Sequence, residues 1–166
     1  FFKLYSGLLE YVNQKGHVLN KAYYKPISNN YERSLVRDYM LQHINIIDDF
    51  VKENPFSFTK KELSMIKQFK YPVTGPFVIM EYDGAYAYFM NQYGSFAVKG
   101  LFDPIHKLVP ASTLPTAVTC LLFQYNDYII YDGLIASHPT KLKKKEINDF
   151  INIYFNSNIY TRITHD

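Results

Sequence analysis

The sequence of 166 residues contains a single cysteine and no tryptophan, and this scarcity excludes several kinds of protein. One thiol, Cys120, cannot form a disulfide framework within the chain, and it argues against a cysteine-based zinc site. The five histidines show no metal-binding spacing such as His-x-x-x-His. We therefore predict neither a metal nor a cofactor, and the cysteine usage favours a reducing, cytoplasmic location.

Long apolar runs and glycine-rich loops are also missing. A membrane-spanning helix needs a run of about 18 apolar residues, and no such run occurs, so we expect no membrane partner. The seven glycines are scattered and form neither a phosphate loop nor a nucleotide fingerprint. The net charge of +3 is too small to indicate nucleic-acid binding by itself. Because the sequence begins with Phe1, we expect a trimmed form or a piece of a longer protein.

What the chain does have is the composition of a folded protein. Hydrophobic residues make up 48% and charged residues 20% of the sequence. Its length fits one domain, or two tightly packed subdomains. Tyrosine and phenylalanine are abundant, with 16 and 13 residues. An AT-rich genome is the favoured explanation of this abundance, ahead of an aromatic binding surface.

The first part of the chain has helical periodicity. We predict helices over residues 1–13, 32–53 and from Thr59 onward, the second of which ends before Pro55. Thr59 and Glu62 have the spacing of a capping box. A further helix is predicted over residues 142–155, and its inward side chains are Ile147, Phe150, Ile151, Tyr154 and Phe155.

From Phe77 the period changes to that of strands. Residues 77–82 and 85–90 flank Asp83–Gly84, which predicts a hairpin with a type I′ turn. Further strands are predicted over residues 95–101, 116–125 and 128–131, and the tail after residue 155 is either another strand or frayed. A second Tyr-Asp-Gly at residues 131–133 indicates a duplicated hairpin or, as we favour, ordinary turn chemistry.

This order of elements predicts the fold class α+β. We expect N-terminal helices packed on a small antiparallel, barrel-like sheet, and a C-terminal helix that closes the structure. The prediction is a single domain over residues 1–166, with a helical part (1–71), a β part (76–137) and a closing helix (140–156).

Three residues are candidates for catalysis. Asp103 and His106 lie in one proline-containing loop, and loops often carry function, although Asp-Pro is also an ordinary turn. Cys120 lies inside an apolar strand, which favours a buried structural thiol over a nucleophile. Because no complete catalytic set is recognisable, the sequence points away from an enzyme.

Two further groups are candidates for binding. Cations at the start of a helix oppose its dipole, so a bound anion near Lys141, Lys144 and Lys145 would offset the conflict. A helix that begins one turn later would leave these lysines as a solvated face, which we favour. Tyr86 and Tyr88 share one face of a strand. If exposed they could stack on bases or sugars or form a protein interface, and if covered by a helix they belong to the core.

Several segments resemble a family of uncharacterised bacterial proteins. They are VRDY (36–39), IIDDFV (46–51), ENP (53–55), VKGL (98–101) followed by Asp103-Pro104, and IIYDGL (129–134). The resemblance extends over roughly residues 1–135. Some members carry a cysteine-rich zinc-binding tail of the SEC-C type, which this chain lacks, so zinc does not carry over. The resemblance implies an architecture and a bacterial origin, but no activity and no catalytic residues.

The sequence thus leaves three functional hypotheses. The first is a non-enzymatic interaction module that binds another protein. The second is weak nucleic-acid or phosphate binding through Lys141, Lys143, Lys144 and Lys145. The third, which we favour least, is a hydrolase-like enzyme that uses Asp103, His106 and Cys120.

Overall fold

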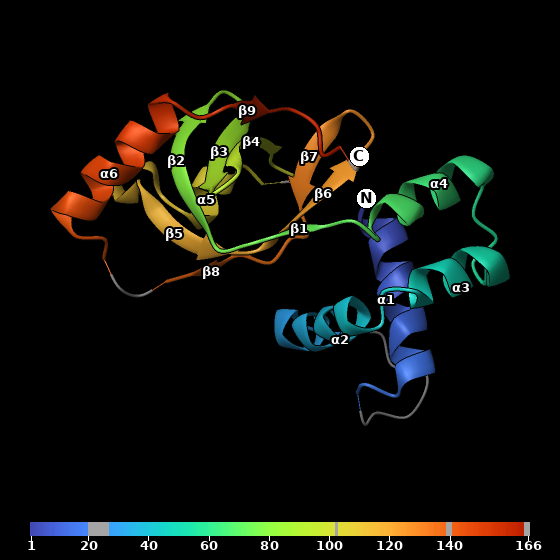
Figure 1. The fold of residues 1–166 in the computed structure, drawn as a ribbon. Helices are drawn as coiled ribbons and strands as arrows, with labels where there is room; N and C mark the ends of the chain where they lie inside the picture. The colour runs from blue at the N-terminus through green and yellow to red at the C-terminus, as the bar shows by residue number, and fades with distance from the viewer. Residues whose placement is uncertain (20–26, 102, 139–140, 165–166) are drawn as a thin grey trace. The chain divides into compact units, whose positions relative to one another are not determined.

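The computed structural model describes residues 1–19, 27–101, 103–138 and 141–164. These residues form six α-helices and nine strands of one sheet, which confirms the α+β prediction. The chain divides into two compact units, Phe1–Lys70 and Tyr71–Asp166, each described by itself below (Figure 1). The division lies one residue from the predicted end of the helical part. The packing of the N-terminal helices on the sheet stays a prediction.

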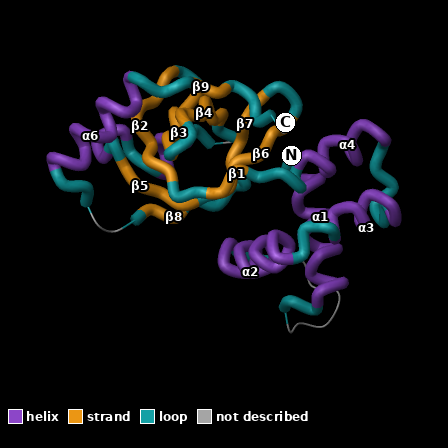
Figure 2. The backbone as a smooth tube through the Cα atoms, viewed as in Figure 1, coloured by secondary structure: helices purple, strands orange, loops and turns teal. Residues whose placement is uncertain are grey.

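The first unit contains four helices (Figure 2). They are α1 (Phe2–Gly16), α2 (Asn30–Gln42), α3 (Ile46–Glu53) and α4 (Lys60–Gln68). Each helix places apolar residues at helical spacing on one face, and together these faces form a core whose fully buried side chains include Leu8, Val12, Val36, Met40, Ile47, Phe50 and Ile66. Helix α1 runs three residues beyond its predicted end, and His17 then closes it in the left-handed conformation. Residues 17–30 are predicted from the sequence to form a polar loop, and half of them, residues 20–26, lie outside the described residues.

The prediction of one helix over residues 32–53 is wrong, because the chain turns between α2 and α3. The backbone N–H of His43 donates to the carbonyls of Tyr39 and Met40, and the N–H of Ile46 donates to the carbonyl of His43. Met40 and Ile47 are both fully buried on either side of this turn. The apolar period therefore continues through the break, which is why periodicity alone could not locate it.

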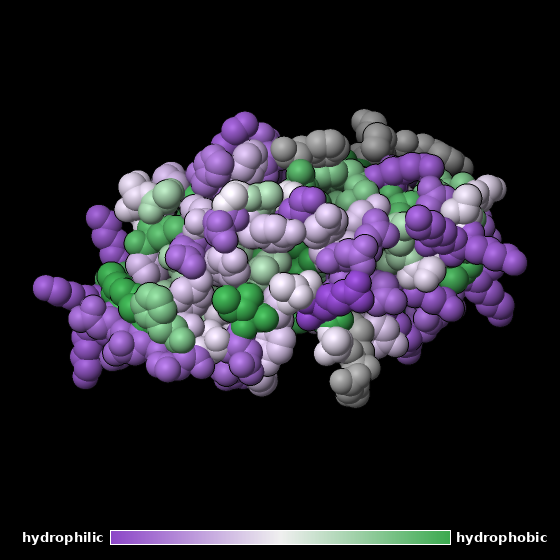
Figure 3. All heavy atoms as spheres, turned by 90° about the horizontal axis from the view of Figure 1, so that it is seen from above, coloured by the Kyte–Doolittle hydropathy of each residue, from purple (hydrophilic) through white to green (hydrophobic). Residues whose placement is uncertain are grey.

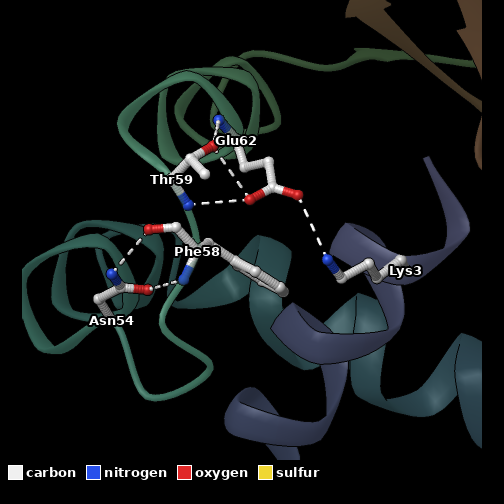
Figure 4. A network of polar contacts seen from close by, with 5 residues as sticks. All are labelled: Lys3, Asn54, Phe58, Thr59 and Glu62. Carbon is white, nitrogen blue, oxygen red and sulfur yellow. Dashed lines mark hydrogen bonds and ion pairs between the residues drawn. The ribbon is translucent and has the colours of Figure 1, made fainter.

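The capping box at the start of α4 is confirmed (Figure 4). The Thr59 hydroxyl oxygen accepts the N–H of Glu62 at 3.2 Å, and the Glu62 carboxylate accepts the N–H of Thr59 at 2.8 Å. Lys3 of α1 lies 3.4 Å from the other carboxylate oxygen. Just before the cap, the Asn54 side chain bonds both the N–H and the carbonyl of Phe58. The bonds from Thr59, followed by Lys3, lower the pKa of the Glu62 carboxyl.

We expect Thr59→Ala to lower the free energy of unfolding by about 1 kcal/mol, the usual effect of losing a helix N-cap. The control is Ser64→Ala, at an exposed position inside α4, which should be neutral or slightly stabilising. The pKa of the Glu62 carboxyl is lower in the folded state than its ordinary value of 4.5. The carboxylate therefore stabilises the folded state above pH 4.5, and this stabilisation is lost as the pH falls below 4.5. Urea unfolding followed by circular dichroism measures both effects, and equal losses in the two variants would contradict the assignment.

The second unit is built on a nine-stranded sheet (Figure 1). The strands that precede its long connection are β1 (Val73–Thr74), β2 (Phe77–Asp83), β3 (Tyr86–Asn91) and β4 (Gly94–Lys99). The connection contains α5 (Ile105–Leu108) and the 3₁₀ turn η1 (Ala111–Thr113). After it come β5 (Thr116–Thr119), β6 (Leu121–Tyr125), β7 (Tyr128–Tyr131), β8 (Ala136–Ser137), the helix α6 (Lys144–Phe155) and β9 (Ile159–Tyr160).

The sheet has the order β1-β6-β7-β4-β3-β2-β5-β8, and β9 pairs with β4. Most neighbours are antiparallel, but β4 is parallel to both β7 and β9. The sheet is not closed, so the barrel-like description in the prediction needs correction: the hydrogen-bonded order ends at β1 on one side and at β8 on the other.

The predicted strand over residues 116–125 is in fact two strands, β5 and β6, which bend apart at Cys120. The strands paired with β5 and β6 are β2 and β1, and the chain between β1 and β2 also bends opposite Cys120. Val73 lies opposite Leu122, and Phe77 opposite Val118, so one antiparallel register continues through the bend. At the bend the N–H of Gly75 donates to the carbonyl of Cys120 at 2.9 Å. The two bent chain segments, β1 with β2 and β5 with β6, thus connect the two sides of the curved sheet.

The bend requires glycine at residue 75, because the ring of Phe77 and the backbone of Cys120 approach this residue closely. A Cβ atom there would lie 2.7 Å from the ring of Phe77 and 3.2 Å from the backbone nitrogen of Cys120. The ring of Phe77 cannot move away freely, because it is 1% exposed in the main core. A side chain at residue 75 would therefore push the two strands apart.

The turns differ in detail from the prediction. Asp83 pairs with Tyr86, so the hairpin turn consists of Gly84 and Ala85 rather than Asp83 and Gly84. Only Gly84 has a positive φ there (58°), which is the pattern of a type II′ turn. The second Tyr-Asp-Gly marks the exit from β7: the Asp132 carboxylate accepts the N–H of Leu134 at 3.1 Å.

Helix α6 covers part of the outer face of the sheet. Its side chains Phe150, Ile151 and Tyr154, together with Leu142 before the helix, pack against a small cluster of buried residues, Val78, Met80 and Met90. Phe155 was predicted to face inward, but it is 78% exposed. It follows Tyr154 directly, and a step of one residue turns a side chain about 100° around the helix and away from the sheet.

Candidate functional site

The three catalytic candidates do not share one environment. Asp103 is exposed and forms an ion pair with Lys107 at 2.9 Å. His106 is exposed on α5, and its ring centroid lies 6.0 Å from that of Tyr82. Cys120 is 2% exposed inside the core at the bend of β5 and β6. A thiol at that depth cannot receive a substrate at the surface where His106 and Asp103 lie.

A groove of about 530 Å³ lies at the β5–β8 margin of the sheet in the second unit. One wall is the connection that follows α5, the floor includes the start of β5 and the end of β8, and the other wall is the approach to α6. Of the described residues fourteen line it, and eight of these are apolar: Leu108, Val109, Pro110, Leu114, Pro115, Ala117, Leu142 and Ile147. The size and the apolar lining are typical of a binding site.

Hydrogen bonds hold the loop wall and the floor of the groove in place. The hydroxyl of Tyr82 donates to the carbonyl of Val109 at 2.6 Å and anchors the loop wall to β2. Within that loop, the Thr113 hydroxyl donates to the carbonyl of Pro110 at 2.7 Å. On the other side, the N–H of His138 donates to the carbonyl of Ala117, and its ring nitrogen Nε2 lies 3.0 Å from the Thr119 hydroxyl. The groove is therefore a built feature of the fold.

The charge around the groove is positive. Lys141 is part of the lining, and none of the described lining residues is acidic. The next lysines precede and begin α6, because the helix starts at Lys144 with Lys143 as its N-cap. Lys144 and Lys145 therefore still lie in the first turn, although the helix begins later than predicted. The Glu146 carboxylate accepts the N–H of Lys143 at 2.7 Å and partly offsets this charge.

Tyr86 and Tyr88 lie on the face of β3 that points away from the main core, and both are half-buried. The ring centroid of Tyr88 lies 6.3 Å from that of Tyr154 in α6, and its hydroxyl donates to Asp83 at 3.4 Å. Burial, followed by the charge of Asp83, raises the pKa of Tyr88. The helix thus covers part of this face, and neither tyrosine lines the groove.

Sequence reasoning singled out Lys141 but missed most of the groove. Leu114, Ala117 and Ser137 carry no recognisable motif, and they meet only because β8 pairs with β5. His138 was noted for its lack of metal-like spacing, not as part of a groove. The one available signal was positional: the groove is formed by the loops that come before and after residues 116–137.

Comparisons of the chain with protein-family models, with curated proteins and with solved structures find no match. The resemblance to an uncharacterised bacterial family therefore stays a prediction. Among the described residues there is no cluster of three or more His, Cys, Asp or Glu side chains that could hold a metal ion. No helix within the described ranges is both long enough and apolar enough to cross a membrane.

The burial of Tyr82, which anchors the loop wall, leads to a prediction about how stability depends on pH. Burial raises the pKa of Tyr82 to about 12, above its ordinary value of 10. Since the folded state holds this proton more tightly, the stabilisation is complete below about pH 10 and is lost as the pH rises toward 12. We expect the free energy of unfolding to fall over this range in the parent protein, and less steeply in Tyr82→Phe.

Urea titrations at several alkaline pH values measure this slope, with Tyr31→Phe as the control because that side chain is 71% exposed on α2. If Tyr82→Phe and the parent protein lose stability in parallel, the hydroxyl does not anchor the loop as described.

Proposed function

We propose that this protein is an interaction module that binds a segment of another protein in the groove between the 108–117 loop and the start of α6. The observation that carries the proposal is the apolar lining of a groove at the β5–β8 margin of the sheet, beside the part that α6 covers. Where α6 packs, its apolar side chains bury Val78, Met80 and Met90. Next to it, Leu114, Ala117 and Ile147 line an open hollow instead.

The occupant that fits this groove is a short segment with apolar anchors and acidic residues. Burial of apolar side chains supplies the affinity. Lys141 in the lining and the neighbouring Lys143, Lys144 and Lys145 supply a positive rim, which favours a negatively charged partner and increases its association rate. A partly exposed leucine, Leu108 (52% exposed), stands at the edge of the groove as a further contact.

Phosphate or nucleic-acid binding through the same lysines is the second candidate. The observation in its favour is the position of Lys144 and Lys145 in the first turn of α6, where backbone N–H groups also attract anions. Against it, the carboxylate of Glu146 already accepts one of these N–H groups. The apolar lining also has no role in binding a phosphate backbone. We therefore favour the protein segment.

A blocking substitution tests the proposal. Ser137 is exposed in the groove floor, whereas Ala136, the preceding residue of β8, is exposed outside the lining. We expect Ser137→Trp to abolish the binding of peptides selected from a random displayed library, and Ala136→Trp to leave it unchanged. Lys141→Glu should weaken the binding of the same peptides about tenfold, by charge reversal at the rim.

The selected peptides should be rich in leucine, isoleucine or phenylalanine together with aspartate or glutamate. Fluorescence anisotropy with one selected peptide and with a labelled single-stranded DNA gives the comparison. Equal peptide binding by the two tryptophan variants would overturn the groove as the site. Binding of the DNA alone, weakened by salt and by Lys144→Glu, would replace the proposal by the second candidate.

A further inference from the structure

A second surface of the β unit surrounds Tyr93, away from the groove. The turn Gln92–Tyr93 joins β3 to β4, because Asn91 pairs with Gly94. Tyr93 is 71% exposed, among the most exposed of the large hydrophobic side chains. The Asn91 side chain accepts the N–H of Tyr93 at 2.9 Å and so fixes the base of the turn. The tyrosine ring is thus presented to solvent from a two-residue turn.

Two shallow hollows, of about 560 and 480 Å³, lie on either side of this tyrosine. Both are lined by Asn91 and Tyr93. The larger also contains the carboxamide residues Asn152, Asn156 and Asn158 from the end of α6 and the chain that follows it. The smaller contains a second tyrosine, Tyr160, which is 37% exposed.

The strand pairing of β9 holds these parts together. The N–H of Ser95 donates to the carbonyl of Asn158 at 2.9 Å, and the hydroxyls of Ser95 and Ser157 lie 2.9 Å apart. Gly94 leaves room for the ring of Tyr160, since a Cβ atom there would lie 2.6 Å from that ring. The backbone that carries Asn158 and Tyr160 is therefore held against the start of β4.

We propose that this Tyr93 surface, defined by Asn91, Tyr93, Asn152, Asn156 and Asn158, binds a neutral saccharide. A tyrosine ring offers an apolar face with a polar tip, and the C–H face of a sugar ring can pack flat against it. A carboxamide both donates and accepts hydrogen bonds, as does a sugar hydroxyl. Asn156 uses its N–H₂ group on the carbonyl of Asn152 at 2.8 Å, which leaves its oxygen as an acceptor.

The absence of charge selects this ligand class over nucleic acid. None of the described residues that line the larger hollow is charged, whereas a nucleic-acid site needs cations for the phosphates. In the smaller hollow the one cation among the described residues, Arg162, is paired with Asp127. On the face of the molecule that Figure 3 shows, hydrophobic residues form several separate areas among hydrophilic ones.

The test is a titration of the whole protein, labelled with ¹⁵N, with soluble neutral oligosaccharides of glucose, mannose, galactose and N-acetylglucosamine. We expect at least one of the four to shift the backbone amide signals of residues 91–94 and 152–158 at millimolar concentration. Tyr93→Ala should weaken this binding about tenfold or more, the loss expected when a stacking aromatic ring is removed. Asn152→Ala should weaken it less.

A matched control is available in the first unit, because Tyr31 of α2 has the same exposed fraction, 71%. Tyr31→Ala should leave the binding unchanged, and the groove variant Ser137→Trp should also bind the saccharide normally. No shift with any of the four oligosaccharides would overturn the proposal. So would an equal loss in the Tyr31 and Tyr93 variants, or shifts that depend only on protein concentration and so report self-association.

Discussion

The second unit depends on the bend at which Gly75 meets Cys120. Here two chain segments, residues 73–79 and 116–122, change direction together without losing their register. The hydrogen bond from the Gly75 N–H to the Cys120 carbonyl continues the ladder through the bend. The Phe77 ring fills the space beside it and leaves no room for a side chain on residue 75. The same bend buries Cys120, which is 2% exposed.

The bend also decides where the groove forms. Because β5 leaves the bend in one direction and β6 in the other, β5 and β8 make one margin of the sheet. That margin, with the 108–117 loop anchored by Tyr82, supplies the floor and one wall of the groove. The Tyr93 surface has a different origin, the pairing of β9 with the first residues of β4. The two surfaces share no described lining residue, so each can be tested alone.

Local patterns in the sequence were sufficient for most helices and strands, and they failed where distant residues decide. The capping box at Thr59 was readable because both partners lie within one turn. The break after Gln42 was not, since buried residues continue at helical spacing across it. The split of the predicted strand at Cys120 depends on Gly75, a residue 45 positions away. A run of apolar residues has the same sequence pattern whether it forms one strand or two. The groove residues Ala117 and Ser137 meet through another long-range pairing, that of β5 with β8, which no local motif encodes.

The most direct test of this account is amide hydrogen exchange at Gly75 in the intact protein. If the bend organises the unit, the Gly75 amide proton exchanges only when the hydrogen bonds between β2 and β5 open. The Gly75 amide and the amides of β2 and β5 then show the same free energy of opening. If instead the Gly75 proton exchanges through a much easier local opening while β2 and β5 stay protected, the bend is a loose connection. The continuous ladder would then not be what holds the sheet and its groove in place.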